Sequence, residues 1–312
     1  MYKITEIVAA ELNYLELESP DGQSKAKICL NQGGSLSEFV FETIQILADY
    51  NSACYLDTYA SSILFPFANR IKDGEYTFNN LKYKFQCNEI DKNNALHGFV
   101  YNKPFDVIDR VTTQEDASVT LCYKDEGKTE GFPFKFSIEL TYQLNKNGLI
   151  LSIKVVNNDK NTFPFSIGWH PYFYSKNLDN SALNFKSDTK YVYDNQQIIS
   201  GTTELDIEMP FQLKGVKLDT GYPLKTNEIQ FSTPQYNMNI RSTSKENFLQ
   251  LYTPDRQNVV AIEPMTGATD NFNNKIGLQT LQPNETYHVK WSIAIEPCNT
   301  HTNQLINSLC NS

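Results

Sequence analysis

Residues 134–157 read FKFSIELTYQLNKNGLILSIKVVN, and this stretch indicates the fold class of the chain. Apolar and polar side chains alternate over residues 134–144 and again over residues 149–157, which is the period of a β-strand. The dipeptide Asn147-Gly148 between the two runs is typical of a tight turn. The stretch therefore predicts two strands joined by a turn.

The same alternation is found along the rest of the chain. It predicts further strands at residues 25–30, 76–85, 118–123, 248–253 and 288–295. Turn signals such as Asp73-Gly74 and Asn79-Asn80 recur at short intervals. Only residues 39–47 and 302–309 show the period of a helix, each for about two turns. The pattern predicts an all-β protein.

The chain of 312 residues contains no Gly-, Ser- or Pro-rich linker, no block of like charges and no internal repeat. Large all-β units commonly exceed 200 residues, so we expect a single domain over residues 1–312. More than about ten strands do not stay in one open sheet. The expected architecture is a β-supersandwich of stacked, mainly antiparallel sheets, one of whose faces could hold a ligand.

Charge and hydropathy restrict the classes of partner. The 27 Lys and Arg residues against 36 Asp and Glu residues give a net charge of −9. Nucleic acids and anionic membranes favour concentrated positive charge, so neither is expected as a partner. The N-terminus carries acidic residues where the apolar segment of a secretory signal would lie, and no apolar run approaches the length of a membrane span. The expected location is cytoplasmic.

Six cysteines are scattered along the chain without any CxxC pair. This spacing fits buried or free thiols better than a disulfide framework or a zinc site. The cysteines are Cys29, Cys54, Cys87, Cys122, Cys298 and Cys310.

The run FPFSIGWHPYF at residues 163–173 places a histidine in an unusual setting. In a strand, every second residue from Phe163 to Trp169 would share an apolar core face. The opposite face would carry small residues that lead to His170, and Pro171 would then end the hydrogen-bonded ladder. Such a strand could form the floor of a polar pocket with one imidazole in it. The alternative is a histidine with a purely structural role.

Glu263 ends the apolar run VVAI and precedes Pro264 and the turn at Gly267. Partial burial of a carboxyl group there would raise its pKa. A glutamate with a raised pKa suits a general base. The alternative is a glutamate exposed at the end of a strand.

Two further residues could bind a ligand. His97 follows a polar loop and precedes Gly98, which allows backbone or ligand to approach closely. Arg70 lies in the apolar segment 65–71, where its planar fork needs an acceptor: a sugar hydroxyl, a catalytic carboxylate or a backbone carbonyl. An ordinary loop histidine and a surface arginine remain the alternatives.

The common catalytic motifs are absent from the sequence. It contains no phosphate-binding glycine loop, no GxSxG elbow and no HExxH motif. These absences disfavour an NTPase, a dinucleotide-binding enzyme, a serine hydrolase and a zinc peptidase.

Six short motifs, taken together, resemble the successive landmarks of the aldose 1-epimerase, or mutarotase, family. They follow the family's order and span about residues 30–295. HGF and EPxTG are more similar to the bacterial branch that includes LacX-like proteins and hexose-6-phosphate epimerases than to the galactose mutarotases proper. In order, the motifs are GGSL at 33–36, FPFANRIKDGEY at 65–76, LHGF at 96–99, GWHPYF at 168–173, EPMTG at 263–267 and LQPNE at 281–285.

The resemblance implies a β-supersandwich and an isomerase that interconverts the α and β anomers of a free aldose. It implies that Glu263 is the base for the C1 hydroxyl and that His170 is the acid for the ring oxygen. Arg70 and His97 would hold sugar hydroxyls or orient the reacting groups. A histidine and a glutamate of raised pKa suit this chemistry, which needs no metal or organic cofactor. The expected partner is a small aldose sugar, bound by a monomer or homodimer.

The family also places an aspartate on sugar hydroxyls. Asp219 matches best, while Asp194 and Asp206 compete with it. The motif at 283–285 has Asn284 where the family usually has glycine, and asparagine tolerates the left-handed conformation of that turn, so activity should not suffer.

Three other functions remain open. A hexose-6-phosphate 1-epimerase would favour several converging arginines or lysines, and the chain has only four arginines: Arg70, Arg110, Arg241 and Arg256. A non-catalytic sugar-binding protein would not need both His170 and Glu263. A glycosidase ordinarily uses two carboxylates, and Glu263 is the single good candidate.

Overall fold

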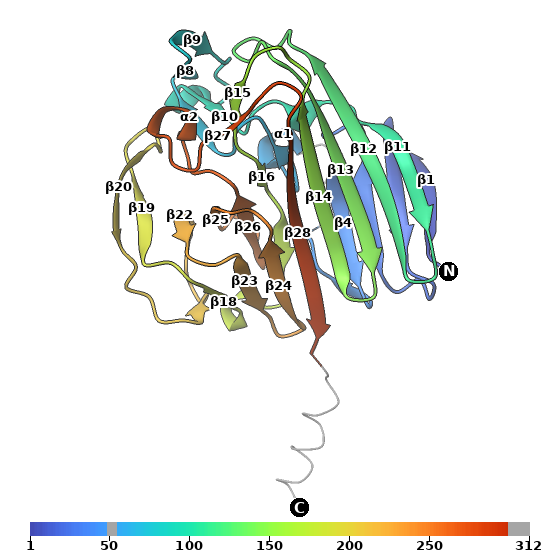
Figure 1. The fold of residues 1–312 in the computed structure, drawn as a ribbon. Coiled ribbons are helices and arrows are strands. Elements are labelled where there is room, and N and C mark those ends of the chain that lie inside the picture. The colour runs from blue at the N-terminus through green and yellow to red at the C-terminus, as the bar shows by residue number, and fades with distance from the viewer. Residues whose placement is uncertain (49–54, 299–312) are drawn as a thin grey trace, which may run out of the picture.

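The stretch 134–157 forms two long neighbouring strands at the centre of the molecule, β13 (Lys135–Asn145) and β14 (Gly148–Asn157). The computed structural model describes residues 1–48 and 55–298 (Figure 1). The two strands pair in antiparallel register from Phe136 opposite Asn157 to Asn145 opposite Gly148. Buried and partly exposed residues alternate along both, so one face of each strand packs into the core.

These strands belong to a nine-stranded antiparallel sheet. Its order is β11 (Asp106–Thr112), β12 (Asp116–Glu126), β13, β14, β28 (Thr286–Pro297), β24 (Tyr236–Ser242), β23 (Glu228–Ser232), β18 (Ala182–Phe185) and β21 (Phe211–Gln212). The C-terminal strand β28 lies between β14 and β24, and it thereby joins two parts of the sheet that are distant in sequence (Figure 1).

An N-terminal sheet of five antiparallel strands stacks against this large sheet. The Tyr142 hydroxyl of β13 donates to the Gly34 carbonyl at 2.8 Å, and the side chains of Leu121 and Leu140 also approach Gly34. Figure 1 shows the N-terminal strands, in blue, beside the green strands β11–β14. The strands of this sheet are β1 (Lys3–Ala9), β2 (Leu12–Glu18), β3 (Lys25–Cys29), β4 (Ser35–Phe41) and β5 (Ile44–Gln45).

A third sheet contains several short strands. Its order is β22 (Asp219–Leu224), β25 (Asn247–Tyr252), β26 (Val259–Met265), β16 (Gly168–Trp169) and β6 (Ile63–Leu64), with β17 (Tyr172–Tyr174) also paired to β26. Leu249, Leu251 and Ile262 are fully buried and belong to the main hydrophobic core. Their sequence neighbours Gln250 and Glu263 point to the opposite face, because side chains alternate along a strand.

Short elements complete the described residues. Paired strands are β7 (Arg70–Lys72) with β10 (Asn94–Leu96), β8 (Glu75–Phe78) with β9 (Leu81–Lys84), β15 (Phe163–Phe165) with β27 (Gln279–Leu281), and β19 (Thr189–Tyr193) with β20 (Ile199–Glu204). The helical turns are α1 (Tyr55–Thr58), α2 (Asn271–Asn274), η2 (Ile90–Lys92), η3 (Val100–Asn102) and η4 (Leu178–Asn180). Within residues 1–48 and 55–298, no helix is long and apolar enough to cross a membrane.

An aromatic cluster fills the core beneath the segments that carry Arg70 and His97. The ring of Phe65 lies 4.9 Å from that of Phe136, and the ring of Phe132 lies 5.4 Å from that of Phe163. Such ring pairs stabilise beyond the area they bury, by about 0.5–1.5 kcal/mol each. The cluster gives the loops above it a rigid base.

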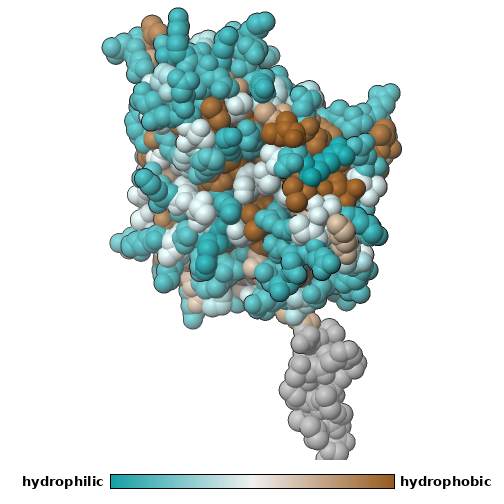
Figure 2. Space-filling model, turned by 45° about the vertical axis from the view of Figure 1, so that its right-hand side comes forward, coloured by the Kyte–Doolittle hydropathy of each residue, from teal (hydrophilic) through white to brown (hydrophobic). Residues whose placement is uncertain are grey.

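The exposed hydrophobic residues of the described part of the chain do not gather on one element. On the side shown in Figure 2, hydrophobic residues form separate groups among hydrophilic ones. The large exposed hydrophobic residues are spread over several elements, with Ile108 and Val111 together on β11. They are Met1, Val8, Leu56, Leu81, Ile90, Ile108, Val111 and Val192.

The structure confirms the all-β class and its stacked antiparallel sheets, and it corrects two local predictions. Residues 39–47 are not a helix, because Phe39 and Phe41 both face the core from β4 and a tight turn at Glu42 (φ 46°) and Thr43 (φ 67°) leads to β5. Residues 76–85 are not one strand, because a two-residue turn at 79–80 divides them into β8 and β9. The predicted helix at 302–309 lies outside the described residues.

Candidate active site

A pocket of about 330 Å³ contains all five residues that the sequence singles out. Arg70, His97, His170, Asp219 and Glu263 line it, together with other residues of β25, α1 and the loops around them. Asp194 and Asp206, the two competing aspartates, are not among the lining residues. The sheet of β22, β25 and β26 supplies one wall of this pocket.

Glu263 and His170 form the buried pair of the pocket. Glu263 Oε1 lies 3.5 Å from His170 Nε2, and Glu263 is 2% exposed. Strand β26 continues through Pro264 to Met265, so Glu263 lies within the strand rather than at its end as predicted. Its neighbour Ile262 belongs to the core, and the alternation of the strand therefore points Glu263 into the pocket.

His170 lies in a gap between two strands. Strand β16 ends at Trp169, β17 begins at Tyr172, and Pro171 lies between them, which agrees with the expected end of the ladder. Trp169 is fully buried and its indole N–H donates to the Ser61 carbonyl at 3.2 Å. The predicted alternation thus holds at this point, with Trp169 in the core and His170 in the pocket. The His170 ring stacks on Tyr172 with centroids 4.9 Å apart.

His97 is held in the left-handed backbone region, with φ at 65°. The next residue, Gly98, also has positive φ, and a Cβ atom there would clash with the Phe65 carbonyl oxygen. The close backbone approach expected of this glycine is therefore present. In this conformation the His97 ring lies edge-on to the His170 ring, with centroids 5.2 Å apart. It also lies edge-on to the Tyr59 ring, with centroids 4.8 Å apart.

The acceptor for Arg70 is Glu89, which the sequence reasoning missed. Arg70 Nε donates to Glu89 Oε2 and Nη2 donates to Oε1, both at 2.8 Å. Asn94 Nδ2 donates to Glu89 Oε2 at 2.9 Å. Glu89 is 19 residues from Arg70, and no local pattern marks this pair.

Asp219 is positioned by a second residue that the sequence did not reveal. Gln250 Nε2 donates to Asp219 Oδ1 at 2.8 Å, and Tyr193 Oη donates to Gln250 Oε1 at 3.2 Å. Asp219 itself is exposed at the pocket mouth. Asp194 instead accepts hydrogen bonds from the backbone of its own turn, and Asp206 is exposed. Of the three candidates, Asp219 alone lies at the pocket.

Burial shifts the protonation of the central residues. It raises the pKa of Glu263 well above its ordinary value, as expected from the sequence, and the charge of Asp219 raises this pKa further. Burial lowers the pKa of His170 to about 4. Burial also lowers the pKa of His97, and the nearby His170 and Arg70 add to that effect. At neutral pH both imidazoles are therefore neutral in the free pocket.

Several polar atoms of the pocket have no protein partner. Among the described residues, nothing hydrogen-bonds to Glu263 Oε2, His170 Nδ1 or His97 Nδ1, although all three are buried. Unpaired polar groups in such positions are costly, and they cluster where a ligand or water completes them. No group of three or more His, Cys, Asp or Glu side chains within residues 1–48 and 55–298 is placed to hold a metal ion.

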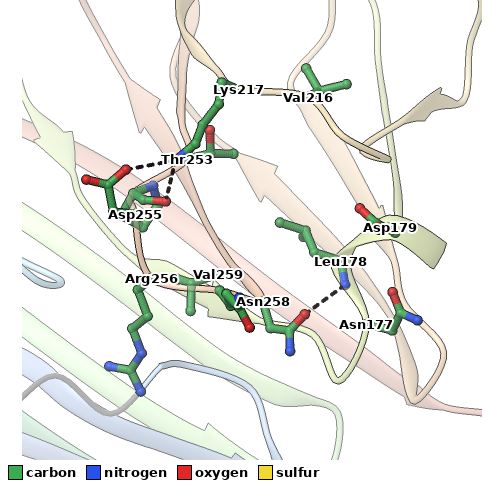
Figure 3. Close-up of a pocket in the computed structure, with 12 residues that line it drawn as sticks. Asn177, Leu178, Asp179, Val216, Lys217, Thr253, Asp255, Arg256, Asn258 and Val259 are labelled. Atoms are coloured by element: carbon green, nitrogen blue, oxygen red, sulfur yellow. Dashed lines mark hydrogen bonds and ion pairs between the residues drawn. The ribbon is translucent and has the colours of Figure 1, made fainter.

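A second cavity, of about 420 Å³, lies where β22 begins and β25 ends. Lys217 Nζ donates there to Asp255 Oδ1 at 3.0 Å and to the Pro254 carbonyl at 3.1 Å. Figure 3 shows Lys217 and Asp255 directed toward each other. The Asn258 side chain accepts from the Leu178 backbone N–H. This cavity contains none of the five predicted residues and no histidine.

Comparisons with known proteins agree with the resemblance found in the sequence. A family model described as aldose 1-epimerase matches residues 15–294. The uncharacterized protein YihR of Escherichia coli K12 is 22% identical over 273 residues, which cover 84% of this chain and 87% of that protein.

Solved structures share the fold. A galactose mutarotase-like protein from Clostridium acetobutylicum has a TM-score of 0.86 at 22% identity and covers 95% of this chain and 99% of its own. A galactose 1-epimerase from Lactobacillus acidophilus has a TM-score of 0.78 at 17% identity and covers 96% of this chain and all of its own (100%).

Proposed function

We propose that this chain, which belongs to the aldose 1-epimerase family, interconverts the α and β anomers of a free hexose by acid–base opening and closing of the sugar ring. The observation that carries the proposal is the buried pair of Glu263 and His170, 3.5 Å apart on the wall of one polar pocket. The pocket volume, about 330 Å³, is at the lower end of the range for small-molecule sites, which suits a single sugar ring.

Ring opening needs one proton removed and another delivered. The Glu263 carboxylate takes the proton of the C1 hydroxyl, and the electron pair of that O–H bond forms the C1 carbonyl. The bond between C1 and the ring oxygen breaks, and the ring oxygen takes a proton from the His170 imidazolium. Glu263 is then neutral, His170 is neutral, and the sugar is an open-chain aldehyde.

Ring closure reverses these roles. Rotation about the C1–C2 bond presents the other face of the carbonyl to the C5 hydroxyl. His170 removes the proton of that hydroxyl while Glu263 returns a proton to the carbonyl oxygen, so the opposite anomer forms and the pair regains its starting state. Throughout the cycle the two residues share one proton.

The shifted pKa values of the pair are consistent with this sharing. Burial favours the neutral carboxyl and the neutral imidazole, which together carry one proton. The ion-pair form carries the same proton on His170. A sugar hydroxyl that donates to the unpaired Glu263 Oε2 would favour the carboxylate, and binding thus prepares the form that opens the ring.

Arg70, His97 and Asp219 would hold the sugar against the acid and the base. Asp219 is an exposed acceptor held by Gln250, and the buried His97 Nδ1 has no protein partner among the described residues. Holding the reacting groups in line can supply several kcal/mol of the barrier reduction. These contacts raise the rate without taking part in proton transfer.

Polarimetry tests the proposal. Freshly dissolved α-D-glucose and α-D-galactose should reach their anomeric equilibrium faster with the wild-type protein than without it. Glu75→Gln, which changes an exposed carboxylate outside the pocket, is the matched control and should accelerate equally. A spontaneous rate on both sugars and also on glucose 6-phosphate would leave a non-catalytic sugar-binding protein as the better account.

A further inference from the structure

Arg70 is the only cationic residue among the described residues that line the pocket. Four acidic residues line the same pocket: Asp57, Glu89, Asp219 and Glu263. The lining therefore holds an excess of acidic groups, even with Glu263 neutral. Within the described lining, Arg70 is therefore the charged group that would attract an anion.

Glu89 occupies the side of Arg70 that best binds an anion. The Nε–Nη2 edge meets the two carboxylate oxygens of Glu89 in a bidentate pair, with both N···O distances at 2.8 Å. Nη1 donates to Asn69 Oδ1 at 3.1 Å. A guanidinium has five N–H donors, and these bonds use three of them. Among the described residues, the other two remain for a ligand, and a neutral hydroxyl can accept from them.

Glu89 is itself fixed and charged. The side chains of Arg70 and Glu89 are 14% and 16% exposed, so water screens the pair only weakly. Burial alone would raise the pKa of Glu89, but the hydrogen bonds from Arg70 and Asn94 outweigh burial and hold its pKa below the ordinary value. Asn94 is fully buried and also donates to the Gln196 carbonyl, which anchors it behind Glu89.

We propose that Glu89 determines substrate specificity by occupying Arg70 and thereby restricts the pocket to aldoses without a negative charge. This inference rests on the proposed function. A phosphate, sulfate or carboxylate group would have to displace Glu89 from the guanidinium or lie near an uncompensated carboxylate. An uncharged sugar needs only the two remaining N–H donors. Removal of the Glu89 charge frees Arg70 as an anion-binding group.

Binding measurements test this role without depending on catalysis. Isothermal titration calorimetry would give dissociation constants for D-glucose, D-glucosamine, D-glucose 6-phosphate and D-glucuronate. Wild type should bind glucose and glucosamine more tightly than either anionic sugar. Glu89→Gln keeps the shape of the side chain and should shift the ratio of anionic to neutral affinity by about tenfold or more toward the anions.

Two variants separate this explanation from a general effect of charge. Glu75→Gln removes an equal charge outside the pocket and should leave the ratio unchanged. Arg70→Gln added to Glu89→Gln should abolish the gain, because the gain comes from the freed guanidinium. A wild-type protein that binds anionic sugars as tightly as glucose would overturn the proposal without any variant. An unchanged ratio of anionic to neutral affinity in Glu89→Gln would also overturn it. The same holds if the gain in anion affinity persists when Arg70→Gln is added.

Failure of this inference and failure of the proposed function look different. If wild type discriminates against anions and Glu89→Gln shifts the affinity ratio toward them as expected, the role of Glu89 stands even when no sugar reaches equilibrium faster. If wild type accelerates glucose anomerisation but Glu89→Gln leaves the affinity ratio unchanged, the epimerase stands and the role of Glu89 is wrong.

Discussion

The nine-stranded sheet and the sheet that forms the pocket wall use β-structure in opposite ways. In the first, β13 and β14 are 11 and 10 residues long and largely alternate between buried and less buried positions. In the second, β16 and β6 have two residues each, and β26 is buried at all seven positions, Glu263 included. Regular strands maximise buried apolar contact, whereas the interruption between β16 and β17 leaves a gap from which His170 meets Glu263 of β26. We therefore propose that the first region supplies stability and that the second supplies the chemistry.

The sharpest way to test this division is to remove the acid or the base. Glu263→Gln and His170→Asn keep the approximate shape of each side chain and remove its proton-transfer capacity. Each should lower the rate of anomerisation by about 10²- to 10⁴-fold, the usual contribution of general acid–base catalysis. Exchange NMR on galactose measures the rate, and circular dichroism checks the fold. Variants that fail to fold, or full activity in either variant, would contradict this division between stability and chemistry.

A substitution in the nine-stranded sheet should lower stability and leave catalytic activity unchanged. Leu140 is fully buried on β13, where it packs near Gly34. Leu140→Ala removes buried methyl groups and leaves a cavity, which should lower the free energy of unfolding by about 2–5 kcal/mol. Urea denaturation measures this loss. The catalytic rate of the folded fraction should stay close to that of wild type, and a specific loss of activity would show that the two regions are not separable.

The pH dependence of kcat/KM tests whether the pair shares one proton. Below about pH 4, His170 in the free enzyme also binds a proton, so the pair lacks a base and activity should fall about tenfold per pH unit. Above the raised pKa of Glu263, the pair loses its single proton and lacks an acid. The profile should be bell-shaped. A profile that stays flat through pH 4 would contradict the assignment of His170.

A smaller effect on stability should have the opposite sign from that of Leu140→Ala. Because Glu263 has a higher pKa in the folded protein than its ordinary 4.5, the wild type loses stability as the pH rises above 4.5. Glu263→Gln removes this penalty. The variant should be more stable than wild type at neutral pH, on the order of 1 kcal/mol, and the difference should vanish below pH 4.5. Thermal unfolding of both proteins at pH 4 and pH 8 would measure the difference. A variant no more stable than wild type at pH 8 would refute the prediction.

The long strands could be predicted from the sequence because one face of each is buried, so apolar and polar residues alternate along it. The helix prediction for residues 39–47 is wrong because Glu42 and Thr43 form a left-handed turn without the glycine or asparagine that usually signals one. Asn284, in contrast, adopts φ 64°, as the sequence indicated.

His170 and Glu263 could be recognised because each interrupts an apolar run with a polar group. Glu89 and Gln250 could not be found in this way. Each acts through a partner 19 or 31 residues away. The pairing of β22 with β25 brings Gln250 to Asp219. A bridge from Glu89 to Asn94 on β10, which pairs with β7, brings Glu89 to Arg70. No local pattern encodes these pairings. The sequence therefore indicated the buried pair for which we propose a catalytic role, but not the residues that position its neighbours.

The most direct test of the central claim is a double-variant cycle. The rate of galactose anomerisation would be measured by exchange NMR for wild type, Glu263→Gln, His170→Asn and the protein with both changes. If the two residues share one proton as a unit, the double variant should be about as slow as either single variant. Losses that multiply in the double variant would contradict that account, as would a wild-type rate no faster than the spontaneous one.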